Sequence, residues 1–252
     1  MGVFVVTGSA GGIGGAIASK VEAEGHRVIG VDLRHADVEA DLSSAAGRRA
    51  AIEAVTDEAG ASLDGLLVCA GLGPTVAGDL IVQVNYFGAV DLLDGLRPLL
   101  AAGTEPAAVA ISSNSLGTVP PDDRSLIDPC LAGDVDAAMA AVKELHPAFA
   151  YGMSKRALAL AVRRRAPEWA GEGIRLNALA PGPIQTPLYQ ATLDDPDLAP
   201  FVEDFPSPMG VGAVEAVAEV AWFLCSAAGR HVTGEVLFVD GGTDAVLRPD
   251  VV

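Results

Sequence analysis

The sequence is poor in cysteine and holds no long apolar run. Its 3 cysteines among 252 residues, Cys69, Cys130 and Cys225, are an odd and widely spaced set. This argues against a disulfide framework and for free thiols in a reducing compartment. Neither they nor the 4 histidines have metal-ligand spacing, so we expect no metal site. Because no run of about 18 apolar residues occurs and a strand pattern begins at residue 3, we expect no membrane span and no signal peptide, hence a cytoplasmic protein.

Positive charge is scarce as well. Lys and Arg total 16 against 33 Asp and Glu, which gives a formal net charge of −17. A surface of this sign repels the phosphates of nucleic acids and anionic lipid headgroups. We therefore expect neither nucleic acid nor a membrane as a partner.

Glycine, in contrast, is abundant where the chain begins. A short β-branched run, residues 3–7, ends in a cluster with Gly8, Gly12 and Gly14, and a helical pattern opens at Ile13. Without a Cβ, glycine lets the backbone turn sharply and lie against a diphosphate at the positive end of a helix. The spacing T-G-x-x-x-G-x-G differs from the commonest dinucleotide fingerprint, and glycines that serve only a turn are the alternative.

The next apolar run favours the dinucleotide. Residues 26–33 are typical of a second strand, and this strand ends in Asp32, about 20 residues beyond the glycines. A carboxylate at this place accepts hydrogen bonds from both ribose hydroxyls and repels a 2′-phosphate. Asp32 thus favours NAD over NADP, although Arg34 nearby could soften that preference.

Strand and helix patterns then alternate to the end of the chain. Further strands are expected at residues 63–73, 107–111, 174–179 and 236–239, and helices at residues 44–58, 82–100, 149–170 and 213–227. This alternation predicts an α/β fold, a single Rossmann-type doubly wound parallel sheet with helices on both faces. We expect one domain, residues 1–252.

Two segments depart from the alternation. Residues 114–147 carry a proline-rich loop and one short helix with Asp134 as its cap, and they read as an insertion. Residues 188–208 are rich in Pro and Asp and hold Tyr189, Phe201 and Phe205, which is the composition of a lid with an apolar inner face. Both segments are expected to shape a substrate pocket.

The candidate chemistry is carried by Tyr151 and Lys155. They stand four residues apart in a predicted helix, so their side chains share one face. A phenol titrates near pH ~10, and a neighbouring ammonium lowers its pKa toward the working range of an acid-base catalyst. Ser113, at the end of the fourth strand of the pattern, could orient the same substrate oxygen. Alone, a Tyr-x-x-x-Lys pair is a weak signal.

In combination these residues resemble the short-chain dehydrogenase/reductase family along essentially the whole chain. The matching features are Thr7-Gly8-x-x-x-Gly12-x-Gly14, Ser113, Tyr151-x-x-x-Lys155, Pro181-Gly182 and Asp240-Gly241-Gly242. The resemblance implies about seven strands, an NAD(P)-dependent interconversion of carbonyls and alcohols, and a catalytic set of Asn85, Ser113, Tyr151 and Lys155.

The glycine loop, Asp32 and the resemblance together place the cofactor contacts. The expected contacts to NAD are Gly8, Gly12, Ile13, Gly14, Asp32, Leu33, Asp41, Leu42, Ala70, Gly71, Tyr151, Lys155, Pro181, Gly182, Ile184 and Thr186. Asp41 has a second reading as a solvated carboxylate that caps the following helix.

A narrower resemblance is to the bacterial 3α-hydroxysteroid dehydrogenases/carbonyl reductases, carried by runs such as Cys69-Ala70-Gly71-Leu72-Gly73-Pro74. It implies an NAD-dependent oxidoreductase for a 3α-hydroxysteroid and its 3-ketone, with Tyr151 as general acid/base. The insertion matches poorly, so a carbonyl reductase or alcohol dehydrogenase for small substrates is an alternative. A non-catalytic nucleotide-binding protein is another. Family members are commonly homo-oligomers, so we expect a dimer or tetramer.

Overall fold

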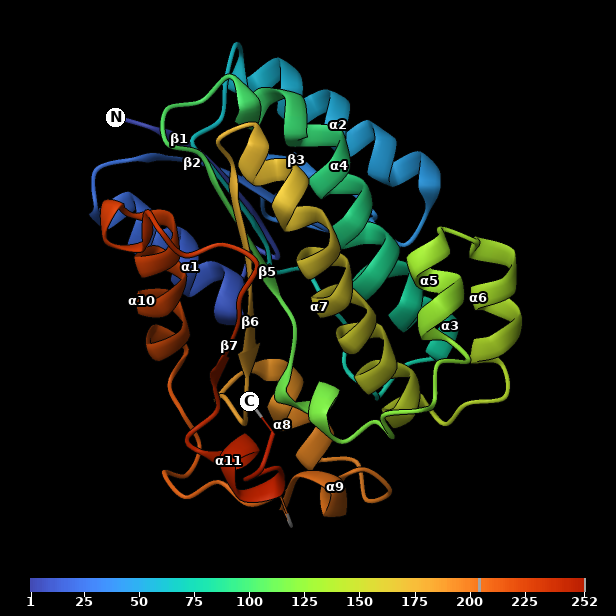
Figure 1. Ribbon diagram of the computed structural model, residues 1–252. Coiled ribbons are helices and arrows are strands. Elements are labelled where there is room, and N and C mark those ends of the chain that lie inside the picture. Colours follow the sequence, from blue (N-terminus) through green and yellow to red (C-terminus); the bar gives the residue numbers. More distant parts are fainter. Residues whose placement is uncertain (204, 252) are drawn as a thin grey trace.

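A parallel sheet forms the centre of the molecule (Figure 1). Within residues 1–203 and 205–251, which the computed structural model describes, it has seven strands in the order β3-β2-β1-β4-β5-β6-β7. All neighbours pair in parallel. The strands are β1 (Val3–Thr7), β2 (Arg27–Asp32), β3 (Val38–Glu39), β4 (Gly65–Val68), β5 (Ala107–Ile111), β6 (Arg175–Pro181) and β7 (Val236–Val239). The predicted doubly wound α/β fold is confirmed.

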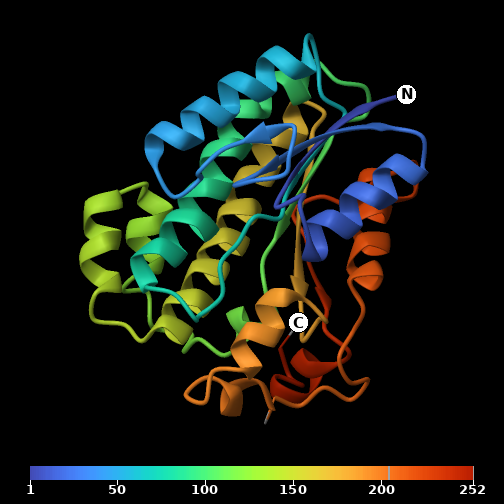
Figure 2. The ribbon, with the colours of Figure 1, turned by 180° about the vertical axis from the view of Figure 1, so that it is seen from behind.

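Helices cover both faces of the sheet, as Figures 1 and 2 show from opposite sides. One face carries α1 (Gly12–Ala23) and α10 (Val214–Cys225), and the other carries α2 (Ala45–Ala59), α4 (Ala89–Ala101) and α7 (Pro147–Gly171). Successive side chains of a strand point to opposite faces. Accordingly Phe4 and Val6 pack into one hydrophobic core, while Val5 between them packs into the other.

Several helices begin where a side chain caps them. The Ser44 hydroxyl accepts a hydrogen bond from the amide of Gly47 at 3.0 Å, and Asp134 accepts one from Ala137 at 2.9 Å. These bonds satisfy amide groups that have no partner inside the first helical turn. The predicted cap at Asp134 is thus confirmed, and of the two neighbouring serines that the sequence offered as the earlier cap, Ser43 and Ser44, it is Ser44 that caps α2.

The helix expected at residues 82–100 is longer and less regular than the sequence suggested. α3 (Gly78–Val82) runs into a π-helical segment, Gln83–Gly88, and this runs into α4. Asn85 lies in the π-helical segment. Such wide turns are rare and often occur at functional sites.

The insertion between β5 and α7 folds into three short helices. A 3-10 turn, Asn114–Gly117, comes first, and α5 (Ile127–Ala132) and α6 (Val135–Val142) follow. α5 packs on α7, and α6 packs on α3 and α5 (Figure 1). The sequence pattern predicted only α6, because α5 is short and contains Pro129.

The carboxyl ends of the strands are covered by small helices. α8 (Pro187–Leu193), α9 (Ala199–Glu203) and α11 (Thr243–Leu247) lie together at this end in Figure 1, and a 3-10 turn, Ala227–Gly229, follows α10. Asp204 and the side chain of Phe201, both in the expected lid, lie outside the described residues. Across the described part of the chain, no helix combines the length and the apolar character that crossing a membrane requires.

Candidate active site

A cavity of about 1120 Å³ lies at the carboxyl ends of the strands. In open parallel sheets this edge, at the point where the strand order reverses, is where ligands bind. Here the reversal falls between β1 and β4. All of the expected cofactor contacts and three of the four expected catalytic residues, Ser113, Tyr151 and Lys155, line this cavity.

The loop between β1 and α1 needs its glycines for two different reasons. Gly8 and Gly12 have φ of 70° and 54°, in the left-handed region that side chains rarely adopt. Gly14 has an ordinary backbone, but a Cβ there would lie 2.2 Å from the carbonyl oxygen of Gly8. The glycines therefore bring the first turn of α1 against the loop and place the start of this helix at the cavity, which suits a diphosphate.

Asp32 stands at the end of β2 beside this loop. One carboxylate oxygen accepts a hydrogen bond from the amide of Ala10 at 3.0 Å, and the other accepts one from Leu33 at 2.6 Å. A carboxylate oxygen can accept more than one hydrogen bond, so Asp32 keeps acceptor capacity toward the cavity that it lines. This placement fits a ribose and disfavours a 2′-phosphate.

Asp41 also lines the cavity, and hydrogen bonds within its own turn hold its side chain. Its carboxylate accepts hydrogen bonds from the Ser43 amide at 2.9 Å and the Ser43 hydroxyl at 2.6 Å. These bonds hold the pKa of Asp41 below its ordinary value. Asp41 thus lines the cavity as a charged acceptor, and it does not cap α2, whose cap is Ser44.

Thr7 organises the middle of the cavity, a role the sequence analysis missed. Its hydroxyl accepts hydrogen bonds from the amides of Cys69 and Ala70, both at 2.9 Å. This fixes the end of β4 beside β1, so that Ala70 and Gly71 line the cavity. The Thr-Gly pair at the end of β1 was the available signal.

Ser113, Tyr151 and Lys155 come together from β5 and α7. Lys155 is 4% exposed, and its ammonium donates a hydrogen bond to the carbonyl of Ile111 at 2.8 Å. It lies 6.0 Å from the centre of the Tyr151 ring. In return, the Ser112 hydroxyl donates to the carbonyl of Lys155 at 2.8 Å. β5 and α7 are thereby joined at the cavity, with the phenol and the ammonium on the same side of the helix.

The expected direction of the Tyr151 pKa shift is wrong. Burial raises the pKa of Tyr151, and the group that works against this is the Ser113 hydroxyl, through a hydrogen bond. Lys155 does not offset this effect of burial, although its ammonium lies 6.0 Å from the centre of the Tyr151 ring. Burial lowers the pKa of Lys155 to about 8. The phenol therefore keeps its proton at neutral pH.

Asn85 differs from the other expected catalytic residues because it does not line the cavity. Its side chain is fully buried; it accepts a hydrogen bond from the Leu72 amide at 2.7 Å and donates one to the Leu72 carbonyl at 3.0 Å. A Cβ on Gly71 would lie 3.2 Å from both the Asn85 oxygen and the Lys155 ammonium. Asn85 therefore holds the loop after β4 beside Lys155.

The segment after β6 lines the cavity from the other side. Pro181, Gly182, Ile184 and Thr186 all face it. A Cβ on Gly182 would lie 2.7 Å from the Cα of Asp240, so only glycine lets this segment pack against the end of β7. Thr186 caps α8 by accepting a hydrogen bond from the Tyr189 amide at 3.1 Å.

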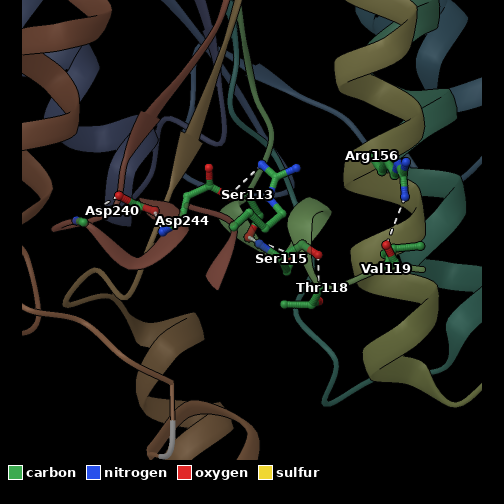
Figure 3. Close-up of polar contacts among 9 residues, drawn as sticks. Ser113, Ser115, Thr118, Val119, Arg156, Asp240 and Asp244 are labelled. Carbon is green, nitrogen blue, oxygen red and sulfur yellow. Dashed lines mark hydrogen bonds and ion pairs between the residues drawn. The ribbon is translucent and has the colours of Figure 1, made fainter. Parts of the chain in front are cut away.

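The remaining wall of the cavity is apolar. It includes Val119 from the insertion, Phe149 at the start of α7, and Leu188 and Phe205 from the expected lid. Only the first part of the insertion, up to Val119, reaches the cavity, while α5 and α6 lie away from it. The 3-10 turn at Asn114–Gly117 is held between α7 and the C-terminal α11, as Figure 3 shows for Ser115, Thr118 and Asp244.

The cavity has room for a cofactor and a second molecule, since single ligand pockets are usually about 300–1,000 Å³. A glycine cradle that a Cβ would fill, a helix N-terminus and a carboxylate beside it match the diphosphate and ribose of NAD(H). Among the described residues, no group of three or more His, Cys, Asp or Glu side chains is placed to hold a metal ion.

Comparison with known proteins agrees with this geometry. A sequence model of the NAD dependent epimerase/dehydratase family matches residues 4–178, and one described as enoyl-(acyl carrier protein) reductase matches residues 135–244. The chain is 44% identical to a 3-alpha-hydroxysteroid dehydrogenase/carbonyl reductase of Comamonas testosteroni, over 99% of both chains. It is 32% identical to 3beta-hydroxysteroid dehydrogenase 1 of Eggerthella lenta, over 94% of this chain and 92% of the relative.

A solved structure is similar throughout. The crystal structure of the 3-alpha-hydroxysteroid dehydrogenase from Pseudomonas sp. B-0831, complexed with NADH, superposes with a TM-score of 0.96 at 42% identity, covering 99% of this chain and 100% of the other. The resemblance that the sequence motifs predicted is confirmed, and the chain belongs to the short-chain dehydrogenase/reductase family.

Proposed function

We propose that the protein is an NAD-dependent oxidoreductase that interconverts a secondary alcohol and a ketone, with Tyr151 as general acid/base. The observation that carries this proposal is that the glycine loop, Asp32, Ser113, Tyr151 and Lys155 all line one cavity. A merely nucleotide-binding protein would have no need for a phenol, a hydroxyl and a buried ammonium beside the cofactor end.

The proposed roles follow from the contacts of each residue. The loop from Gly8 to Gly14 would hold the diphosphate, Asp32 the ribose, and the segment from Pro181 to Thr186 the nicotinamide end. NAD(H), when bound, supplies or accepts the hydride. Lys155, fixed between β5 and α7, would position the nicotinamide ribose and keep positive charge near the phenol.

Tyr151 supplies the proton. Because burial raises its pKa, the phenol is protonated at neutral pH and can donate to the oxygen of a ketone that is being reduced. Ser113 would donate a hydrogen bond to the same oxygen and stabilise its developing charge. Oxidation of the alcohol requires the phenolate, so the oxidative direction should be favoured as the pH rises.

We propose a steroid with a 3-hydroxyl or 3-keto group as the substrate. The apolar wall formed by Val119, Phe149 and Leu188 suits a rigid ring system, and the named relatives are 3-alpha- and 3beta-hydroxysteroid dehydrogenases. Small carbonyl compounds remain the alternative, because the same acid/base set would serve them.

The test measures turnover by the wild type and by Tyr151→Phe, with NADH absorbance as the readout. The substrates are a panel of 3-hydroxysteroids, 3-ketosteroids and simple alcohols and ketones. We expect turnover of a steroid by the wild type, and a fall in kcat of about 10³-fold in the variant at nearly unchanged NADH affinity. Unchanged turnover in Tyr151→Phe would refute the role of the phenol. Turnover of simple ketones alone would favour the alternative substrates.

We also propose a homo-oligomer, a dimer or tetramer, in the cytoplasm. The described cysteines are all unpaired, which suits a reducing compartment, and family members commonly assemble. Light scattering during size-exclusion chromatography would give the mass, and a monomeric mass would contradict the assembly.

A further inference from the structure

Ser115 has no role in the reaction proposed for Tyr151, yet it is hydrogen-bonded directly to Ser113. It lies two positions after Ser113 in the turn at Asn114–Gly117 and lines the cavity. Its amide donates a hydrogen bond to the Ser113 hydroxyl oxygen at 3.2 Å, and its hydroxyl contacts the same oxygen at 3.0 Å (Figure 3).

These two contacts restrict what the Ser113 hydroxyl can do. A serine hydroxyl has one proton to donate and two lone pairs that accept. Ser115 donates to both lone pairs, so the Ser113 proton must point elsewhere, and Ser113 is also hydrogen-bonded to the Tyr151 side chain. The Ser113 hydrogen bond indeed works to lower the pKa of Tyr151.

We infer that Ser115 is a positioning residue that aims the single Ser113 proton and strengthens its donation, to the Tyr151 oxygen when the site is empty and to the substrate oxygen when a substrate is bound. Donors in a chain polarise one another, so a hydroxyl that accepts two bonds donates more strongly. This inference rests on the proposed role of Tyr151.

The position of Ser115 is fixed from two sides. Its carbonyl accepts hydrogen bonds from the amide of Thr118 at 3.0 Å and from the Thr118 hydroxyl at 2.8 Å. On the other side, a Cβ on Gly152 would lie 3.3 Å from that carbonyl, so α7 packs tightly on the turn next to Tyr151.

The C-terminal helix braces the same turn. Arg248 donates a hydrogen bond to Asp244 at 2.8 Å, and a Cβ on Gly117 would lie 2.9 Å from the Arg248 Nε. Asp240 accepts a hydrogen bond from the amide of Asp244 at 2.7 Å, which fixes the start of α11. The turn thus has little freedom to move Ser115 away from Ser113.

The experiment compares Ser115→Ala with Ser115→Thr, which keeps the hydroxyl, and with Ser125→Ala, which removes an exposed serine of the same insertion. The first readout is the near-ultraviolet absorbance of tyrosinate against pH in cofactor-free protein, with the curve of Tyr151→Phe subtracted to isolate Tyr151. The second is the pH profile of alcohol oxidation. Circular dichroism at each pH checks that the proteins stay folded.

We expect Ser115→Ala to raise the pKa of Tyr151 by about 0.5 to 1 pH unit, the size of one lost neutral hydrogen bond. The oxidation profile should move in the same direction, while NADH affinity, Ser115→Thr and Ser125→Ala stay at wild-type values. If Ser115→Ala does not fold, Ser115→Cys takes its place, since a thiol is a weak donor.

An unchanged pKa in Ser115→Ala would overturn the inference, as would an equal shift in Ser115→Thr, because the hydroxyl would then not be responsible. Loss of turnover in Tyr151→Phe together with an unchanged pKa in Ser115→Ala would remove only this inference. Full turnover in Tyr151→Phe would remove the proposed function instead.

Discussion

The two ends of the cavity are built differently. The cofactor end is made largely of backbone that side chains would obstruct, such as Gly14 against Gly8 and Gly182 against Asp240. The substrate end is made of side chains that face open space, and Phe149 there is 47% exposed. The first end tolerates little change in sequence, whereas the second can be altered without disturbing the fold. Specificity for the cofactor is thus constrained by the scaffold, and specificity for the substrate is not.

The largest effect should come from filling the glycine cradle. Gly14→Ala places a methyl group within 2.2 Å of the Gly8 carbonyl oxygen. We expect NADH affinity to fall about 100-fold and the free energy of unfolding to fall by about 3 kcal/mol, because backbone must move. Fluorescence titration and urea denaturation measure both. Gly171→Ala, whose Cβ meets nothing within 4 Å, is the control, and equal behaviour of the two variants would break the comparison.

Lys155 is buried in the cavity wall, and its burial should affect how the free energy of unfolding depends on pH. Its pKa of about 8 is below the ordinary value of 10.5 for a lysine, so between these pH values the unfolded chain binds a proton that the folded chain does not. Relative to a variant without this lysine, which shares all other titrating groups, the stability of the wild type should therefore rise with pH through this window.

Lys155→Met removes that dependence. The variant should be more stable than the wild type at pH 7, by up to about 3 kcal/mol, and this difference in the free energy of unfolding should shrink from pH 8 to 10.5. Urea denaturation of cofactor-free protein at several pH values measures it. A difference between wild type and variant that does not change across the window would contradict the assigned pKa.

Substitution of Asp32 tests whether the cofactor end also sets the preference for NADH over NADPH. Asp32→Ser removes the carboxylate but keeps a hydroxyl at the end of β2. We expect NADH affinity to fall about 10- to 100-fold, the value of a charged hydrogen bond, and NADPH affinity to rise. Titration calorimetry with both cofactors measures the ratio, and equal affinities in the wild type would contradict the role of Asp32.

The smallest effect is expected at the substrate end. Phe149→Ala removes apolar surface from the cavity wall. We expect the binding free energy of a steroid ketone to weaken by about 1–2 kcal/mol, which corresponds to a 5- to 30-fold higher KM. NADH affinity should not change. Phe223→Ala, a partly exposed phenylalanine outside the cavity lining, is the matched control. A change in NADH affinity in Phe149→Ala would show that the two ends are coupled.

The same contrast explains what the sequence could predict. Gly8, Gly12 and Gly14 could be predicted because the backbone there excludes other residues. Asp32 could be predicted from its place at the end of a strand, and the helix caps from their residue types. The set at Ser113, Tyr151 and Lys155 was found through spacing and a family resemblance.

Other features depend on three-dimensional burial and could not be predicted. The pKa of Tyr151 rises because the fold desolvates the phenol, which no local spacing encodes. Asn85 lies in a π-helical segment and is hydrogen-bonded to the Leu72 backbone, neither of which the sequence pattern indicated. Ser115 gains its contact to Ser113 from a 3-10 turn that the sequence pattern did not indicate.

The central claim, that one cavity carries hydride transfer between NAD(H) and a secondary alcohol, is tested most directly with a 3-hydroxysteroid deuterated at the carbinol carbon. The purified protein is incubated with NAD and this substrate, and the NADH formed is examined by mass spectrometry. We predict that the deuterium appears in NADH in the wild type and that Tyr151→Phe forms almost none. Formation of unlabelled NADH, or no NADH from any alcohol tested, would contradict the account.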